Sequence, residues 1–250
     1  MTDLLLNRRT VRRYSSRKVN QNLLDKILEA GARSSTTGNM QLYSIIVTRD
    51  DKMKEGLAPL HFNQPMVREA PVTLTFCADF NRFNKWCRQR GAEPGYDNFL
   101  SFMTAAIDAI IVAQTVSIAA EAEGLGICYL GTVIYNAHKI IELLELPSGV
   151  VPVATVTLGW PDESPGQVDR LPLDAVVHSE KYNDYAPADI DRIYREKEAR
   201  DDSKQFVAEN GLETLAHVFT DVRYKKADNE VFSEILLSVL EKQGFLKDKR

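Results

Sequence analysis

The first residues that could do chemistry form a cluster of arginines near the N-terminus. Four arginines and a threonine fall within the six residues from Arg8 to Arg13. The planar fork of a guanidinium group suits phosphate, and several such groups at one point would bind a phosphate monoester tightly. A solvated basic surface would have the same composition. The cluster alone therefore leaves both interpretations open.

Three further segments could reach a polar or a flat ligand. Residues 34–41 carry hydroxyl and amide groups between a predicted helix and a predicted strand, and residues 63–66 add two amide side chains. Residues 124–132 contain three glycines, which would let the backbone approach a flat ligand closely. Each segment could instead be an ordinary turn. The glycine run is also too short, and in the wrong context, for a dinucleotide-binding fingerprint.

The chain has no convincing acid, base or nucleophile. Its four histidines lack metal-ligand spacing, so we expect no metal site. The nucleophile elbow of hydrolases and the P-loop are both missing from the sequence. We interpret Glu121 and Glu123 as a solvated helix end rather than a pair of catalytic carboxylates. A cofactor that carries the chemistry would explain a chain rich in binding groups.

Hydrophobic periodicity predicts alternating helices and strands, and therefore a sheet covered on both faces, of α/β or α+β class. The predicted helices cover residues 23–32, 101–123 and 136–144, and the predicted strands cover residues 44–48, 71–77, 127–130 and 150–158. We expect Asn136 to cap the third helix. The helix over 101–123 is apolar almost all round, so it must be covered on every side, by the core or by another subunit.

The chain beyond residue 160 has a different character. Prolines and acidic residues dominate residues 162–177, which predicts an extended stretch across the surface. A mainly helical tail follows. Residues 189–200 are mostly charged, whereas an apolar stripe runs from Phe232 to Leu240 and ends before Gly244.

Composition limits the class of protein. The 250 residues are 44% hydrophobic and 26% charged with a net charge of −4, which is typical of a soluble globular protein and argues against nucleic-acid binding. Three cysteines without a CxxC pair suit a reducing compartment. The apolar stretch 105–120 contains Asp108 and Gln114 and is too short to cross a bilayer, and the N-terminal charges follow a leucine run, unlike a signal peptide. We expect a cytoplasmic protein that does not enter membranes.

These same segments resemble the nitroreductase family, and within it the branch of larger, NADPH-preferring flavin reductases. Residues 8–12, Arg-Arg-Thr-Val-Arg, are similar to the opening motif that grips the FMN phosphate and ribityl chain. Residues 38–41 and 63–66 resemble the next two flavin segments, and residues 76–82 continue the resemblance. Residues 124–132 resemble the segment that packs on the isoalloxazine ring. Residues 159–161 and 170–172 resemble the stretch that returns an arginine to the phosphate. The matches run in order from about Arg8 to Tyr182.

The resemblance implies a set of FMN-binding residues drawn from all of these segments. They are Arg8, Arg9, Thr10, Arg12, Gly38, Asn39, Gln41, Gln64, Met66, Tyr129, Leu130, Gly131 and Arg170. Three positions depart from the pattern, because the family often has a histidine at Arg8, an aromatic residue at Met66 and a basic residue at Val168.

The resemblance also implies a fold and an assembly. It predicts the α+β class, in the form of a nitroreductase-like α/β sandwich whose central mixed sheet is flanked by helices. The expected FMN-binding domain covers residues 1–182, and a helical C-terminal extension over 183–250 packs on the core or on a partner subunit. The family forms homodimers with two flavin sites across the interface, and the apolar helix over 101–123 fits the interface helix.

The implied activity is that of an FMN-dependent NAD(P)H oxidoreductase. Our hypothesis is a ping-pong, two-electron exchange in which NADPH or NADH donates to FMN N5 and leaves before a nitroaromatic, quinone or flavin accepts. A flavin-binding or regulatory protein with little turnover is the alternative on the same scaffold. Six basic residues are candidates to read the 2′-phosphate of NADPH: Arg195, Lys197, Arg200, Arg223, Lys225 and Lys226.

Overall fold

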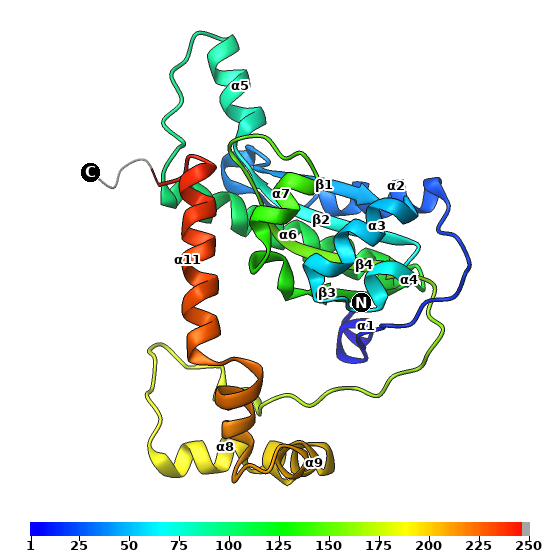
Figure 1. The fold of residues 1–250 in the computed structure, drawn as a ribbon, viewed down its shortest axis with the longest axis vertical. Coiled ribbons are helices and arrows are strands. Elements are labelled where there is room, and N and C mark those ends of the chain that lie inside the picture. The colour runs from blue at the N-terminus through cyan, green and yellow to red at the C-terminus, as the bar shows by residue number, and fades with distance from the viewer. Residues whose placement is uncertain (247–250) are drawn as a thin grey trace. The chain divides into compact units, whose positions relative to one another are not determined.

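The computed structural model describes residues 1–246 of the chain (Figure 1). The chain forms two compact units. The first comprises Met1–Gly166 and the chain from Phe232 onward, and the second comprises Gln167–Val231. The division at residue 182 that the resemblance implies stays a prediction.

A four-stranded sheet is the centre of the first unit. Its strands are β1 (Tyr43–Thr48), β2 (Val72–Asp79), β3 (Gly126–Leu130) and β4 (Val150–Gly159), in the spatial order β1-β2-β4-β3. All three pairings are antiparallel. The α+β class is therefore confirmed, whereas the sheet that the structure describes is antiparallel and not mixed as we expected.

One face of the sheet is covered by α2 (Gln21–Ala32) and α6 (Phe99–Ala122). Alternate strand residues point to opposite faces, and this face receives the larger apolar side chains. The buried cluster beneath the two helices includes Val72, Leu74, Phe76, Val156, Leu158 and Ile127. The strands predicted from the sequence therefore supply the side chains of this core.

Shorter helices cover the other face, in front of the sheet in Figure 1. They are α3 (Asp51–Leu57), α4 (Met66–Glu69) and α7 (Ala137–Leu143), with the 3₁₀ helices η2 (Ala58–His61) and η3 (Gly131–Ile134) between them. Asn136 stands at the start of α7, but its side chain does not cap that helix. It donates instead to the Leu60 carbonyl at 2.9 Å, which ties the start of α7 to η2.

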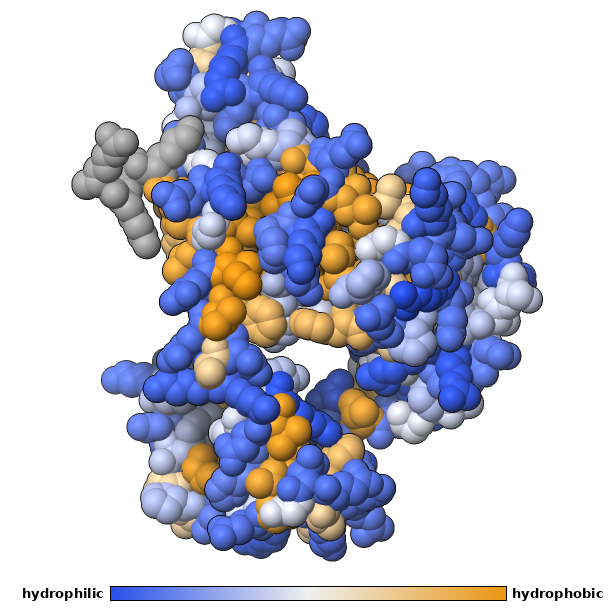
Figure 2. Space-filling view, viewed as in Figure 1, coloured by the Kyte–Doolittle hydropathy of each residue, from blue (hydrophilic) through white to orange (hydrophobic). Residues whose placement is uncertain are grey.

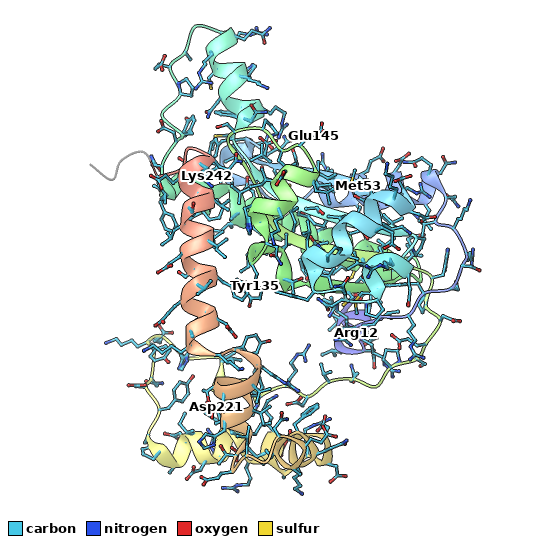
Figure 3. All side chains as sticks on the ribbon, viewed as in Figure 1. Arg12, Met53, Tyr135, Glu145, Asp221 and Lys242 are labelled. Atoms are coloured by element: carbon cyan, nitrogen blue, oxygen red, sulfur yellow. The ribbon has the colours of Figure 1, made fainter. Side chains whose placement is uncertain are left out.

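Three further helices belong to the first unit or run into it. They are α1 (Thr2–Leu6), α5 (Asn81–Gln89) and α11 (Lys226–Lys242), and the 3₁₀ turn η1 covers Thr37–Asn39. Where α11 enters this unit, Phe232 stacks on Tyr135 with ring centroids 4.5 Å apart. Tyr135, labelled in Figure 3, precedes α7 in the sequence. At its end, Val239 and Leu240 are buried in a cluster with Phe102 of α6. Figure 2 shows hydrophobic side chains gathered between α11 and α7.

The helix α6 has two different sides. It is the one described helix long and apolar enough to cross a membrane, yet half of its most apolar window is buried, as in the core helix of a soluble protein. The opposite side, which we call the α6 outer face, is not covered by any part of the chain that the structure describes. Its exposed residues are Phe99, Leu100, Met103, Ile107, Ile110 and Ile111, each at least 39% exposed. The core therefore covers one side of α6, and cover of the other side by another subunit stays a prediction.

The second unit is small and mainly helical. It contains η4 (Leu173–Ala175), α8 (Pro187–Ala199), α9 (Asp201–Glu209), α10 (Leu215–His217) and a π-helical turn over Val218–Arg223. Its buried apolar residues include Ala175, Ile193, Leu215 and Val218.

Candidate functional site

The arginine segment lies along β3. The backbone N–H of Val11 donates to the Ile127 carbonyl at 3.0 Å, so residues beside Val11 run next to the strand. A Cβ on Gly126 would lie 2.6 Å from the Val11 Cβ, closer than two carbon atoms can approach. Gly126 therefore makes room for the arginine segment and not for a flat ligand, which corrects one part of our interpretation of the glycine run.

Arg8 forms an ion pair with a carboxylate. Its Nε lies 3.1 Å from Oε2 of Glu121, and the Glu121 side chain is only 9% exposed. Burial raises the pKa of Glu121, and the Arg8 guanidinium opposes that rise. Glu123 pairs with Lys26 at 2.6 Å. The expectation of a solvated helix end is thus wrong for Glu121, because the folded chain brings a counter-charge to it.

Arg9 and Arg12 leave their guanidinium groups exposed. Arg9 Nη1 donates to the Pro165 carbonyl at 3.1 Å. The backbone N–H groups of Arg12 and Arg13 both donate to Glu163 Oε1, at 2.5 and 3.0 Å, and these bonds lower the pKa of Glu163. Glu163 thereby fixes the backbone, while Arg12 itself is exposed. Two cations next to β3 remain available to an anion.

The end of β3 presents open backbone. Leu130 is 2% exposed and half-buried Tyr129 donates its hydroxyl to Gln114 Oε1 at 3.4 Å. Gly131 is exposed, and apart from its chain neighbours and its own short helix no described atom lies within 4 Å of the place where a Cβ would stand. Of the three glycines in the run, Gly131 is the one beside which a flat molecule has room to approach.

A second loop meets this backbone through His61. Its Nδ1 lies 2.8 Å from Oγ1 of Thr132, the residue after Gly131. Gln64 donates both its backbone N–H and its side-chain Nε2 to the His61 carbonyl, each at 3.2 Å. Met66 is 6% exposed and packs in one cluster with Leu130 and Val11. The arginine segment, the Gln64 loop and the end of β3 are therefore brought together.

The segment Gly38–Gln41 is held by a residue that the sequence analysis did not assign to the site. Asp108 of α6 is 1% exposed, and its Oδ1 accepts from the N–H of Thr37 at 2.9 Å and the Thr37 hydroxyl at 3.0 Å. Its Oδ2 accepts from the Leu42 N–H at 3.2 Å. Asn39 and Gln41 both adopt φ of 55°, a left-handed conformation that side chains rarely adopt. Asp108 holds this strained loop with its polar side chains exposed.

The predicted flavin residues of the first unit fall into two groups. Arg8 contacts α6 at Glu121, whereas Thr37 and Leu42, on either side of the Gly38–Gln41 loop, contact α6 at Asp108. Thirteen residues of helix separate these contacts, which at 1.5 Å per residue places them about 20 Å apart along the axis. The structure therefore joins the arginine segment, Gln64 and Gly131, and keeps Gly38–Gln41 away from them within one chain.

Arg170 belongs to the second unit. There it lines a cavity of about 410 Å³ together with Arg195, Lys197 and Arg200, three of the candidates to read the 2′-phosphate. Lys197 pairs with Asp169 at 2.7 Å. The role of Arg170 at the FMN phosphate stays a prediction.

Comparison with known proteins relates this geometry to one family. A profile described as the nitroreductase family matches residues 5–160. The chain is 33% identical to the FMN reductase (NAD(P)H) of Bacillus subtilis strain 168 over 254 residues, which cover 98% of this chain and 97% of the relative. It is 31% identical to the oxygen-insensitive NADPH nitroreductase of Salmonella typhimurium over 245 residues, 97% of each chain. A solved structure from Bacteroides fragilis NCTC 9343 superposes with a TM-score of 0.97 at 56% identity, covering 98% of this chain and 100% of that one. The family that the ordered segments resemble is therefore confirmed, and the chain belongs to the nitroreductase family.

Proposed function

We propose that this chain is an FMN-dependent NAD(P)H oxidoreductase that reduces nitroaromatics, quinones or flavins. The observation that carries the proposal is the arrangement around β3. The strand has arginines with exposed guanidinium groups along one side and ends in the open backbone of Gly131. A molecule with a phosphate at one end and a flat ring at the other fits both features. The names of the B. subtilis and S. typhimurium relatives agree with this chemistry.

The residues present fit FMN. Arg9 and Arg12 have exposed guanidinium groups that could bind its phosphate, while Arg8 already has Glu121 as a partner. The empty space beside Gly131 could admit the ring, which the backbone would then hold. Met66 and Leu130 are buried, so we expect any contact that they make with FMN to come mainly from their backbone.

Bound FMN would supply the two-electron redox chemistry that the side chains lack. The chain's own part is to bind and orient. The arginines neutralise the phosphate charge, and backbone amides near Leu130 and Gly131 hold the ring with donors that need no reorganisation. A nicotinamide donor and a flat acceptor would occupy the same open side of Gly131 in turn, which is the order of a ping-pong exchange.

We also propose that the active form is a homodimer built on the α6 outer face. Six exposed apolar side chains on one helix are a surface that a soluble protein usually covers. The Gly38–Gln41 loop contacts the same helix about 20 Å from the arginine segment. A second copy packed on this face could bring its own Gly38–Gln41 loop to the arginine segment, and each flavin site would then draw on both subunits.

NADPH is the donor that we favour, with NADH as the other. The cavity of the second unit is lined by Arg170, Arg192, Arg195, Lys197 and Arg200 together with Asp169 and Glu196, and this excess of cations suits a phosphate group. We further propose a cytoplasmic location. All three cysteines are free and buried, as expected for a protein that works in a reducing compartment.

The proposal is tested by loading the purified protein with FMN and adding NADPH or NADH without oxygen. We expect tight FMN binding, rapid loss of the yellow colour, faster with NADPH, and recovery of the colour when a nitroaromatic or quinone is added. Protein that binds FMN but keeps its colour would support the flavin-binding or regulatory alternative. Protein that binds no FMN would overturn the proposed function.

A further inference from the structure

His61 is the most deeply buried polar residue at the junction between the Gln64 loop and the end of β3. Its side chain is 0% exposed. Nδ1 has the Thr132 hydroxyl as its partner at 2.8 Å, and Nε2 is buried without a hydrogen-bond partner among the described residues. Burying a polar ring is costly, so the one hydrogen bond that it makes strongly favours this arrangement of the two loops.

The two ends of His61 act on two different flavin segments. Its imidazole binds Thr132, whose backbone continues directly from Gly131. Its carbonyl accepts both the backbone N–H and the side-chain amide of Gln64. A displacement of His61 would therefore move Gln64 and Gly131 relative to one another.

A neighbouring hydrogen bond keeps the rest of the junction in place. Asn136, just beyond η3, donates to the Leu60 carbonyl of η2 at 2.9 Å. This bond joins η2 to the start of α7 and contacts neither Gln64 nor Gly131. The bond between His61 and Thr132 is therefore the side-chain link that reaches the residue next to Gly131.

We propose that His61 is a positioning residue that sets the spacing between the Gln64 side chain and the Gly131 backbone, so that both contact the FMN ring together. The inference rests on the proposed function, because it takes these two groups as ligands of the ring. It adds His61 and its hydrogen bond to Thr132, which would act on the ring indirectly, through Gln64 and Gly131. The link predicts that FMN affinity and the reduction potential of bound FMN both depend on the Thr132 hydroxyl.

The test is a matched pair of substitutions at Thr132. T132V removes the hydroxyl and keeps the branched shape, whereas T132S keeps the hydroxyl. Both variants, and the wild type, are titrated with FMN by flavin fluorescence, and the midpoint potential of bound FMN is measured. Thermal unfolding of the FMN-free proteins reports on stability alone. Thr132 is half-buried, so we expect all of these proteins to fold.

We expect T132V to bind FMN about fivefold more weakly and to shift the midpoint potential, because the ring loses one of its paired contacts. T132S should match the wild type in both measurements. His61→Asn, whose amide can bind the Thr132 hydroxyl, should lie closer to the wild type than His61→Leu does.

Three outcomes overturn the inference. The first is that T132V and T132S have the same FMN affinity and the same potential. The second is that T132V lowers only the unfolding temperature of the FMN-free protein, because the Thr132 hydroxyl would then have a purely structural role. If T132V does not fold, Thr132→Ala takes its place with the same readouts. If the wild type binds no FMN, the proposed function fails and the inference with it. Failure of the inference alone is recognised by a wild type that binds FMN and a T132V variant that equals it.

Discussion

Arg8 and Glu121 form an ion pair that joins the N-terminal segment to the last turn of α6, with Nε and Oε2 3.1 Å apart. Both side chains are largely covered, at 22% and 9% exposed. A guanidinium that is already paired with a carboxylate stabilises a bound phosphate less than a free guanidinium does. We therefore expect Arg9 and Arg12, more than Arg8, to bind the phosphate.

Arg8→Ala should destabilise the fold. The substitution leaves the Glu121 carboxylate covered and without its counter-charge, which we expect to lower the free energy of unfolding by about 1–3 kcal/mol. The double variant Arg8→Ala/Glu121→Gln should recover part of that loss, because an amide is cheaper to cover than a carboxylate. Urea unfolding of the FMN-free proteins measures both. Equal losses in the single and the double variant would show that the pair has no such role.

Arg12→Ala should weaken FMN binding. Arg12 is exposed next to β3, and a charge-assisted hydrogen bond contributes about 1.5–3 kcal/mol, so we expect affinity to fall roughly 10- to 150-fold. Arg13→Ala is the matched control. Arg13 is also exposed and also donates its backbone N–H to Glu163, but it lies outside the family motif. Fluorescence titration with FMN compares the two, and the assigned role of Arg12 is wrong if both variants bind FMN as the wild type does.

The elements were predictable from the sequence because their signals are local. Strand β4 is a run of β-branched residues, and α6 is apolar over six turns, so both were expected within a few residues of their observed bounds. The antiparallel pairing was not predictable in this way. It depends on which strands become neighbours, and β2 pairs with β4 across more than 70 residues of chain.

The contacts that build the site were harder to predict, because they join distant residues. Nothing local to Glu121 indicates Arg8 as its partner, and nothing near His61 indicates Thr132. Asp108 did carry a signal. A carboxylate in a helix that is apolar almost all round must find hydrogen-bond donors when it is buried. That signal predicts donors for Asp108 but does not say that they come from Thr37 and Leu42.

Asp108→Asn should release the Gly38–Gln41 loop. Asp108 accepts three hydrogen bonds with two oxygens, and an amide would present an N–H group to one set of these donors. We expect the free energy of unfolding to fall by about 1–3 kcal/mol and FMN to bind more weakly. Thr37→Val removes one of the three bonds and should have a smaller effect on both. Unchanged FMN affinity in Asp108→Asn would show that the Gly38–Gln41 loop does not contribute to FMN binding.

Ile110→Asp should break the proposed homodimer. Ile110 is 50% exposed at the α6 outer face, where a partner copy would bury a charge without a counter-charge. We expect a monomer in analytical ultracentrifugation and a loss of FMN affinity, since the partner would no longer supply its Gly38–Gln41 loop. Leu173→Asp, at a residue 74% exposed outside this face, is the control and should remain a dimer. A wild-type monomer that binds FMN fully would contradict the shared site.

His61 should make stability depend on pH in a defined window. Burial lowers the pKa of His61 from 6.5 to about 4, so the folded state resists protonation that the unfolded chain accepts. The stability is complete above about pH 6.5 and is lost as the pH falls toward 4, by about 3 kcal/mol in all. His61→Asn lacks this titration, so the stability difference between wild type and variant should shrink as the pH is lowered from 7 to 4. Asn136→Ala removes a neighbouring bond without a titrating group, and its difference from the wild type should stay constant. A pH-independent difference for His61→Asn would mean that the imidazole is protonated equally easily in the folded and unfolded chain, and would contradict the lowered pKa of His61.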